Sequence, residues 1–277
     1  MRPIYHPALF LRFAGLTLCL MAACKVDGHY YPIDAAPDTD IPIDTDGAPP
    51  PGVVMIPGGA FLRGCNQAVE DCTNLTDQVP LALINVSVFW VDETEVTQAA
   101  YKLCIDAGMC TLPSLAFDPL NKGTYPVVGV TWQQAVDYCA YKGKRLPTEA
   151  EWEKASRGTD GRKYPWGNFD PMCQLAHYLG CALGDTSPLP VASKTGDSPF
   201  GLKDMAGNVL EWVSDWHSNT YYYGSPMMDP KGPDTGVYKV LRGGGVGHGT
   251  SYLRSSYRHT SAPIFPSERV GFRCARD

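Results

Sequence analysis

The sequence predicts an α+β fold, built as a single compact domain with little regular secondary structure. Threonine-initiated helical patterns occupy residues 97–158, and stretches rich in β-branched and aromatic residues precede them. After Arg157 the chain is dense in glycine, proline and aromatic residues and has no long periodic segment. The 277 residues are enough for one such domain and a tail.

The charge balance argues against a nucleic-acid partner. The chain has 23 basic and 29 acidic side chains, a formal net charge of -6, and no run of basic residues that could neutralise phosphates. Its hydrophobic fraction of 44% is ordinary for a globular protein with a packed core.

Residues 1–23 are typical of a signal peptide. Arg2 and Arg12 come before an uncharged apolar run, Phe13–Ala23. This run is too short to span a bilayer. The run ends in MAAC, which resembles a bacterial lipobox, so we expect Cys24 to become the lipidated N-terminus of an exported lipoprotein held in the cell envelope, in the periplasm or at the cell surface. The alternatives are ordinary cleavage, with Cys24 a free or paired thiol, and an uncleaved anchor.

Residues 24–51 predict a tether. Aspartates and prolines recur along this stretch, and almost nothing in it could pack into a core. Such a composition gives a semi-extended, self-repelling chain. The folded domain is expected over residues 52–277.

The domain is expected to open with strands. VVMIPGGAFLRGC, residues 53–65, places β-branched and apolar residues around a Pro-Gly-Gly turn and predicts a β-hairpin. LINVSVFWVDETEVT, residues 83–97, predicts a further strand.

Three helices should follow. The first runs from Thr97 to Ala107 and stops at Gly108, whereas the other two begin with capping boxes, Thr131 with Gln134 and Thr148 with Glu151. The side chains expected to face the core are Ala100, Leu103, Cys104, Ala107, Trp132, Ala135, Val136, Cys139, Ala140, Trp152 and Ala155.

Eight cysteines outside the leader and lipobox form an even set, as expected of disulfides in an exported chain. Near neighbours suggest Cys65–Cys72, Cys104–Cys110 and Cys173–Cys181, which leaves Cys139–Cys274. The sequence alone allows other pairings. A structural zinc site is the competing interpretation, but no CxxC occurs and the histidines are scattered.

Five phrases carry a family resemblance: GKRLPTEAEWEKASRG, YPWGN, FGLKDMAGNVLEWVSDW, VLRGGG and RVGFRCAR. In this order, between about Val53 and Asp277, they resemble the sulfatase-modifying factor family, whose founding activity is the formylglycine-generating enzyme. The resemblance implies a compact α+β domain related to the C-type lectin fold and usually bearing calcium. It also places the family's first disulfide on Cys139 and Cys274.

The resemblance further implies which chemistry is missing. Formylglycine-generating members bind copper(I) through two cysteines, and these positions fall on Gly245 and Thr250 when counted back from GFRC. The family's second disulfide falls on Ser156 and Ser255, as if that bridge had been lost as a unit. Copper(I) prefers thiolates, so copper is not expected here.

A calcium site is expected in DMAGNVLEW. The carboxylates of Asp204 and Glu211 bracket a Gly-Asn turn, a pattern that suits calcium but equally suits a turn-former and a solvated acid. The resemblance implies calcium ligation by Asp204 and Glu211 and by the carbonyl oxygens of Gly207 and Val209.

The stretch from Arg242 to His259 is expected to be a binding surface. Arg242, Arg254 and Arg258 could line a groove for a carboxylate or peptide, beside the amphipathic ring of Tyr252, although they could instead pair with the domain's own acids. The surrounding histidines, His217, His248 and His259, show no metal-ligand spacing and are expected on the surface or in hydrogen bonds.

Three functions remain open at this stage. The first is a calcium-stabilised binding or scaffold domain for a peptide, protein or glycan, attached to a membrane by its lipid. The second is an oxidoreductase with divergent chemistry, of the type that acts in siderophore maturation. The third, formylglycine generation, requires a different register or a remote cysteine.

Overall fold

The computed structural model describes residues 23–26, 29–32, 51–73, 75–181 and 187–277. The chain divides into two units, residues 1–39 and 40–277. In the first unit, β1 (Ala23–Val26) and β2 (His29–Pro32) pair antiparallel, with Cys24 opposite Tyr31. The rest of the expected signal peptide and most of the tether lie outside the described residues, so lipidation of Cys24 stays a prediction.

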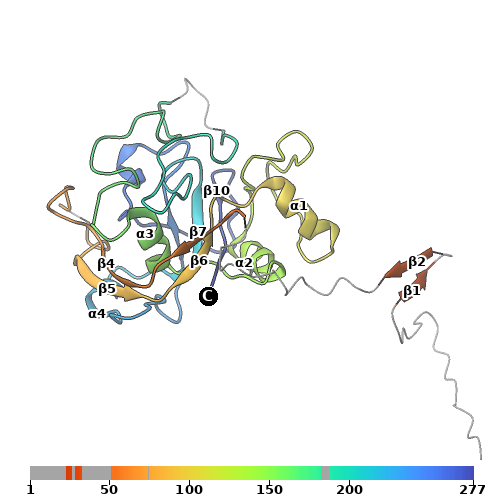
Figure 1. Cartoon of the computed structure of the whole chain (residues 1–277), viewed down its shortest axis with the longest axis horizontal. Helices are drawn as coiled ribbons and strands as arrows, with labels where there is room; N and C mark the ends of the chain where they lie inside the picture. Colours follow the sequence, from red (N-terminus) through yellow and green to blue (C-terminus); the bar gives the residue numbers. More distant parts are fainter. Residues whose placement is uncertain (1–22, 27–28, 33–50, 74, 182–186) are drawn as a thin grey trace, which may run out of the picture. The chain divides into compact units, whose positions relative to one another are not determined.

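The second unit mixes short strands and helices, as predicted (Figure 1). Its strands are β3 (Val53–Ile56), β4 (Gly59–Arg63), β5 (Ala82–Val86), β6 (Phe89–Asp92), β7 (Leu210–Trp216), β8 (Lys239–Arg242), β9 (His259–Ser261), β10 (Val270–Gly271) and β11 (Ala275–Arg276). Its helices are α1 (Gln98–Asp106), α2 (Trp132–Tyr141), α3 (Glu149–Arg157), α4 (Tyr221–Gly224) and the 3₁₀ helix η1 (Thr250–Leu253). These strands form sheets in the orders β10-β7-β8-β9, β11-β6-β3 and β4-β5.

The predicted hairpin over residues 53–65 is wrong. β3 pairs with β6, and β4 pairs with β5, so the two strands belong to different sheets. The corner between them is held by Lys154 of α3, whose buried ammonium donates to the carbonyl oxygens of Pro57, Gly59 and Val86. A long-range contact therefore overrides the local Pro-Gly-Gly turn signal. The predicted strand over residues 83–97 is also divided, into β5 and β6.

The helix starts are confirmed. Thr97 caps α1, and both predicted capping boxes are present, at Thr131 for α2 and Thr148 for α3. The predicted inward faces are wrong at three positions: Leu103, which is 63% exposed, and Ala107 and Ala140 are all exposed, and in α1 Tyr101 is buried instead.

Two large clusters form most of the core. One packs α1 and α2 against β7 and β10 around Tyr101, Tyr138 and Trp212. The other packs α3 against β3 to β6 around Phe61 and Trp152. Each fully buried aromatic or aliphatic side chain stabilises the fold by about 1.5 to 3 kcal/mol, so these clusters supply the main driving force for folding. Within the described ranges, no helix combines the length and the apolar character needed to cross a membrane.

Candidate functional site

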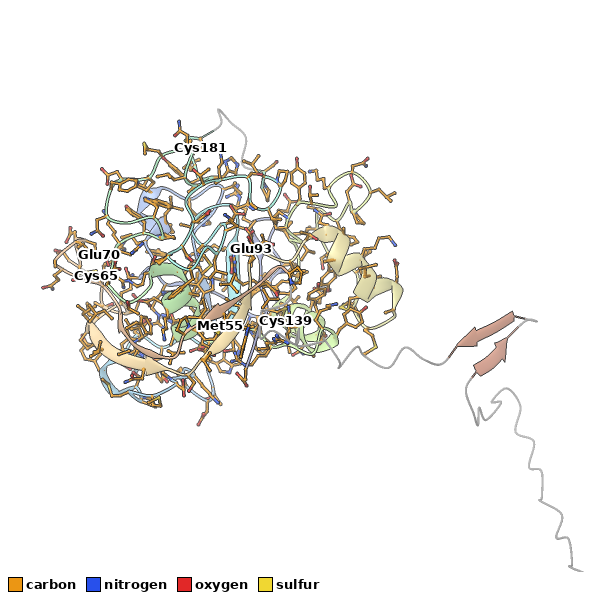
Figure 2. The ribbon with its side chains drawn as sticks, viewed as in Figure 1. Met55, Cys65, Glu70, Glu93, Cys139 and Cys181 are labelled. Carbon is orange, nitrogen blue, oxygen red and sulfur yellow. A yellow bond between two sulfur atoms is a disulfide. The ribbon has the colours of Figure 1, made fainter. Side chains whose placement is uncertain are left out.

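The four predicted disulfides are confirmed: Cys65–Cys72, Cys104–Cys110, Cys139–Cys274 and Cys173–Cys181. They are spread through the domain, as the labelled Cys65, Cys139 and Cys181 show in Figure 2. Cys139–Cys274 joins residues separated by 135 positions and ties α2 to the chain just before β11. Disulfides of this kind form and persist in oxidising compartments, so they are compatible with export.

The positions of the family's second disulfide lie together in space. Ser156 of α3 and Ser255 are both buried, and their hydroxyl oxygens are 2.8 Å apart in a hydrogen bond. The two serines are 99 residues apart in the sequence. Ser156 therefore lies opposite Ser255, as the alignment to the family motifs implies. The same alignment places the two missing copper thiolates at Gly245 and Thr250, and the contact supports it.

The arginines expected to line a binding groove are instead in the interior. Arg242 is fully buried and pairs with Glu149 at 3.1 Å and Glu153 at 2.8 Å. Arg258, with 4% of its surface exposed, donates to both carboxylate oxygens of Glu149. The prediction that these arginines face a ligand is wrong, because two carboxylates of α3 bind them inside the domain.

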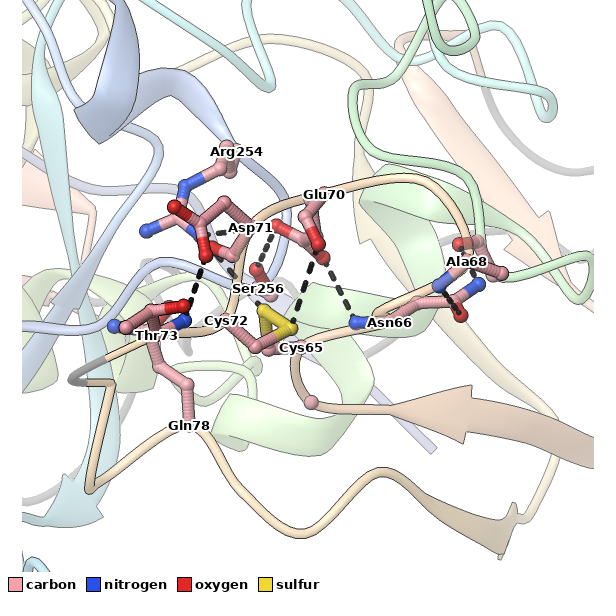
Figure 3. The surroundings of a disulfide bond; sticks show 12 residues. Cys65, Asn66, Ala68, Glu70, Asp71, Cys72, Thr73, Gln78, Arg254 and Ser256 are labelled. Atoms are coloured by element: carbon pink, nitrogen blue, oxygen red, sulfur yellow. Dashed lines mark hydrogen bonds and ion pairs between the residues drawn. A yellow bond between two sulfur atoms is a disulfide. The ribbon is translucent and has the colours of Figure 1, made fainter.

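Arg254 is also buried and paired with an acid of the domain. Its guanidinium lies 3.1 Å from the carboxylate of Glu70, beside the Cys65–Cys72 disulfide. Figure 3 shows that Ser256 also donates to Glu70, so this one carboxylate holds two residues of the segment. The arginines of residues 242–258 thus fix the segment to the domain.

The segment also carries a half-buried aromatic cluster of His248, Tyr252, Tyr257 and His259. Tyr252 lies at the centre, with its ring centroid 5.0 Å from that of His248 and 4.6 Å from that of Tyr257. His248 and His259 are also in contact, at 5.7 Å between centroids, which their sequence positions did not indicate. Burial lowers the pKa of both histidines, which favours their neutral imidazole form.

Neither expected copper-ligand position offers a thiol, and one of them has no space for a side chain. A Cβ atom at Gly245 would lie 2.8 Å from the carbonyl oxygen of Asn208 and 3.0 Å from the Cα of Val209. Thr250 is exposed at the start of η1. A cysteine at residue 245 would therefore require the neighbouring backbone to shift, because its Cβ atom would be too close to Asn208 and Val209.

The expected calcium loop turns sharply. Asp204, Gly207 and Asn208 have φ angles of 56°, 92° and 58°, in the left-handed region that only glycine adopts freely. Asp204 accepts a hydrogen bond from the backbone of Ala192, and its pKa is raised by burial.

Glu95 joins Asp204 at this loop, although its sequence context carries no signal for a ligand. It is 1% exposed, it accepts from Asn208 at 3.0 Å through one oxygen, and the other carboxylate oxygen has no partner in the described part of the chain. Burial, with the neighbouring charge of Asp204, raises the pKa of Glu95 well above its usual value. One buried carboxylate oxygen beside the loop is therefore unsatisfied, and carboxylate oxygen is a donor that suits a hard cation.

Glu211 is engaged elsewhere. Arg273 donates to both of its oxygens, at 2.7 and 2.8 Å, and Trp152 donates from its indole nitrogen at 2.9 Å. Among the residues that the structure describes, no group of three or more His, Cys, Asp or Glu side chains could hold a metal ion. The expected calcium site has only two carboxylate side chains, together with two carbonyl oxygens. In such a site the carboxylate of Glu211 would contact both Arg273 and the ion.

The family follows from a comparison with known sequences. Residues 40–277 match the model of the sulfatase-modifying factor enzyme 1-like domain. The chain belongs to this family. A formylglycine-generating enzyme of Streptomyces coelicolor is 34% identical over 283 residues, which cover 82% of this chain and 89% of that protein.

Other known proteins are similar to this chain over comparable lengths. The serine/threonine-protein kinase Pkn1 of Chlamydia trachomatis is 43% identical over 246 residues, but this chain spans only 38% of that protein. The solved structure of PvdO from Pseudomonas aeruginosa is 25% identical, with a TM-score of 0.70 over 83% of this chain and all of that chain. These similarities confirm a single compact domain of mixed helix and sheet, whereas the names of the relatives indicate different functions.

Proposed function

We propose that this chain is an envelope-anchored domain that binds a ligand and does not generate formylglycine. The observation that carries the proposal is Gly245, where one copper thiolate is expected and where a Cβ atom would meet backbone atoms at 2.8 and 3.0 Å. Thr250, at the second position, offers only a hydroxyl, and copper(I) selects soft thiolates. Copper is therefore not expected as a cofactor.

The location rests on sequence and on disulfides together. The charged start, the short apolar run and the MAAC ending favour export and lipidation of Cys24, and the disulfides need an oxidising compartment. The anchor would hold the domain at a membrane through residues 24–51.

The ligand surface is the aromatic cluster of His248, Tyr252, Tyr257 and His259. Tyrosine and histidine rings combine an apolar face with a polar group, and this suits contacts with a peptide, a protein or a glycan. Since Arg242, Arg254 and Arg258 pair with internal carboxylates, the surface recognises its ligand without them.

Calcium would act as a structural cofactor. We assign its ligands to Asp204, Glu211 and the carbonyl oxygens of Gly207 and Val209. Glu95, which has one unsatisfied buried oxygen, would add its negative charge beside the site without ligating the ion. The ion would neutralise carboxylates that otherwise repel one another inside the domain.

The second candidate is an oxidoreductase with divergent chemistry. It is favoured by the contact between His248 and His259, whose ring centroids are 5.7 Å apart and whose pKa values are lowered by burial. Both histidines belong to the segment that also contains Gly245 and Thr250. Neutral imidazole is a common ligand of redox-active metals. The aromatic cluster would then be a reaction site and not only a contact surface.

Mass spectrometry of a cysteine-containing sulfatase peptide separates these functions. The purified protein, supplied with copper(I) and oxygen, should leave the peptide mass unchanged, while the Streptomyces coelicolor enzyme serves as the positive control. Appearance of the aldehyde product would refute the proposal. Oxygen consumption that depends on His248 and His259 but yields no aldehyde would favour the second candidate.

A further inference from the structure

A cavity of the folded unit lies away from both regions described above. It has a volume of about 900 Å³ and lies between α2, the end of β7 and residues 229–234. None of its lining residues belongs to the aromatic cluster or to the calcium loop. An inference about this pocket is therefore independent of the proposed function.

Lys239 lines this pocket with an incompletely satisfied ammonium group. The residue is 3% exposed, and its Nζ atom lies 3.8 Å from the ring centroid of Trp132 and 3.9 Å from that of Trp216. The one hydrogen bond that Nζ donates within the described ranges goes to the carbonyl oxygen of Ser214, at 2.7 Å. Since an ammonium group has three donors, aromatic faces take the place of further acceptors.

Other cations of the domain have more hydrogen-bond acceptors or carboxylate partners than Lys239. Lys154, equally buried, donates to three carbonyl oxygens, and the pocket residues Lys144 and Arg145 pair with carboxylates. In the described part of the chain, Lys239 has no carboxylate within ion-pair distance. Burial lowers its pKa to about 8, and the charge of Asp215 only partly opposes that shift.

The rest of the lining limits the chemistry of a partner. Apolar side chains form one part of the wall; they are Val86, Val88, Val136, Ala140 and Leu146. Charged side chains form another part: the acids are Glu151, Asp229, Asp234 and Asp277, and the cations beside Lys239 are Lys144, Arg145 and Lys231. Since the acids and cations of the lining balance, the pocket suits a ligand with a single negative charge better than one with several.

We propose that this pocket binds a monocarboxylate attached to an apolar group, with the carboxylate paired to Lys239 and the apolar group against the aliphatic wall. A carboxylate supplies the acceptors that the buried ammonium lacks, and charge-assisted hydrogen bonds of this kind are about twice as strong as neutral ones. The same chemistry is offered by a free organic acid and by the C-terminus of a peptide that ends in an apolar residue.

Calorimetric titration of the full folded protein tests the pocket with defined probes. The probes are hexanoate, N-acetyl-L-leucine and an acetylated pentapeptide ending in leucine, each compared with its carboxamide. We expect saturable binding of the acids and at least tenfold weaker binding of the amides. Preference for hexanoate and N-acetyl-L-leucine would identify a free acid, and preference for the pentapeptide a peptide terminus. Equal binding of acids and amides, or no binding of any acid, overturns the proposal.

Substitution of Lys239 tests the contact itself. Lys239→Met should weaken acid binding at least tenfold, and Lys239→Arg should retain part of it. Lys163→Met is the matched control, because Lys163 also lies over an aromatic ring, that of Tyr164, but does not line the pocket. Unchanged affinity in Lys239→Met overturns the assignment.

A measurement on the unsubstituted protein covers the case in which Lys239→Met does not fold. NMR of labelled lysine side chains should show the pKa of Lys239 rising by at least one unit when N-acetyl-L-leucine is added. The amide should leave it unchanged. A pKa that does not respond to the bound acid would place the carboxylate elsewhere and refute the proposal.

Discussion

Two long-range links cross the domain, and they differ in chemistry. Cys139–Cys274 is a disulfide, whereas Ser156 and Ser255 make a hydrogen bond between positions that the family resemblance assigns to a second disulfide. All four residues are at most 1% exposed. The geometry of the second contact therefore persists without its covalent bond. The difference shows that packing around α3 positions these residues, and that a disulfide there would mainly restrict the unfolded chain.

Removal of the covalent link should have the largest effect. The double variant Cys139→Ala/Cys274→Ala opens a loop of 135 residues, and the loop-entropy model gives a loss of about 5 kcal/mol in the free energy of unfolding. Denaturant unfolding under non-reducing conditions measures it. Cys104→Ala/Cys110→Ala, which opens a six-residue separation, should lose only about 2 kcal/mol in the same model. Equal losses would contradict this account.

Restoration of the second bridge should have the next largest effect. Ser156→Cys/Ser255→Cys should form a disulfide on oxidation and raise the free energy of unfolding by about 2 to 4 kcal/mol. Peptide mapping without reductant checks the bond, and unfolding with and without reductant checks its contribution. Two free thiols in the folded, oxidised protein would show that the side chains are not placed as the hydrogen bond indicates.

The proposed calcium ion would be a third kind of link, between the loop at Asp204 and Glu211 of β7. A ligand at 100 times its dissociation constant stabilises the folded state by about 2.7 kcal/mol. Chelation should therefore lower the melting temperature, and Glu95→Gln should reduce the response to added calcium. Asp160→Asn, an exposed carboxylate bonded to Arg162, is the control. An unchanged melt after exhaustive chelation argues against the site.

Disruption of the serine contact should have the smallest effect. Ser255→Ala leaves the hydroxyl of Ser156 buried without its partner and should cost about 1 to 3 kcal/mol. Ser156→Ala/Ser255→Ala removes both polar groups and should cost less than the single variant. Thermal or denaturant unfolding of both variants compares them. A larger loss in the double variant would mean that the serines contribute mainly through packing.

The local capping signals in the sequence were correct. The capping boxes at Thr131 and Thr148 depend on residues three positions apart, and the structure has both. The near-neighbour disulfides likewise need no knowledge of how distant segments approach one another. Cys139–Cys274 joins distant segments, and it was predicted by exclusion and by the family resemblance.

The interior position of the arginines could not be predicted in this way. The sequence of α3 predicts only Trp152 and Ala155 on the inward face, yet all nine of its residues are buried. Arg242 and Arg258, which are 93 and 109 residues from Glu149, cover the acidic face. The pattern of one helix contains no information about such a distant partner, and the same limit explains the wrong hairpin at β3 and β4.

Because its arginines are bound inside the domain, the segment from Arg242 to Arg254 can tolerate substitutions at the positions between them. Arg242 at one end and Arg254 at the other are bound to internal carboxylates, while Gly244 and Gly245 meet neighbouring backbone and admit no larger residue. The residues between Gly247 and Leu253 include exposed positions whose exchange leaves these anchors in place. Diversity introduced there would change what the domain displays while its scaffold stays the same.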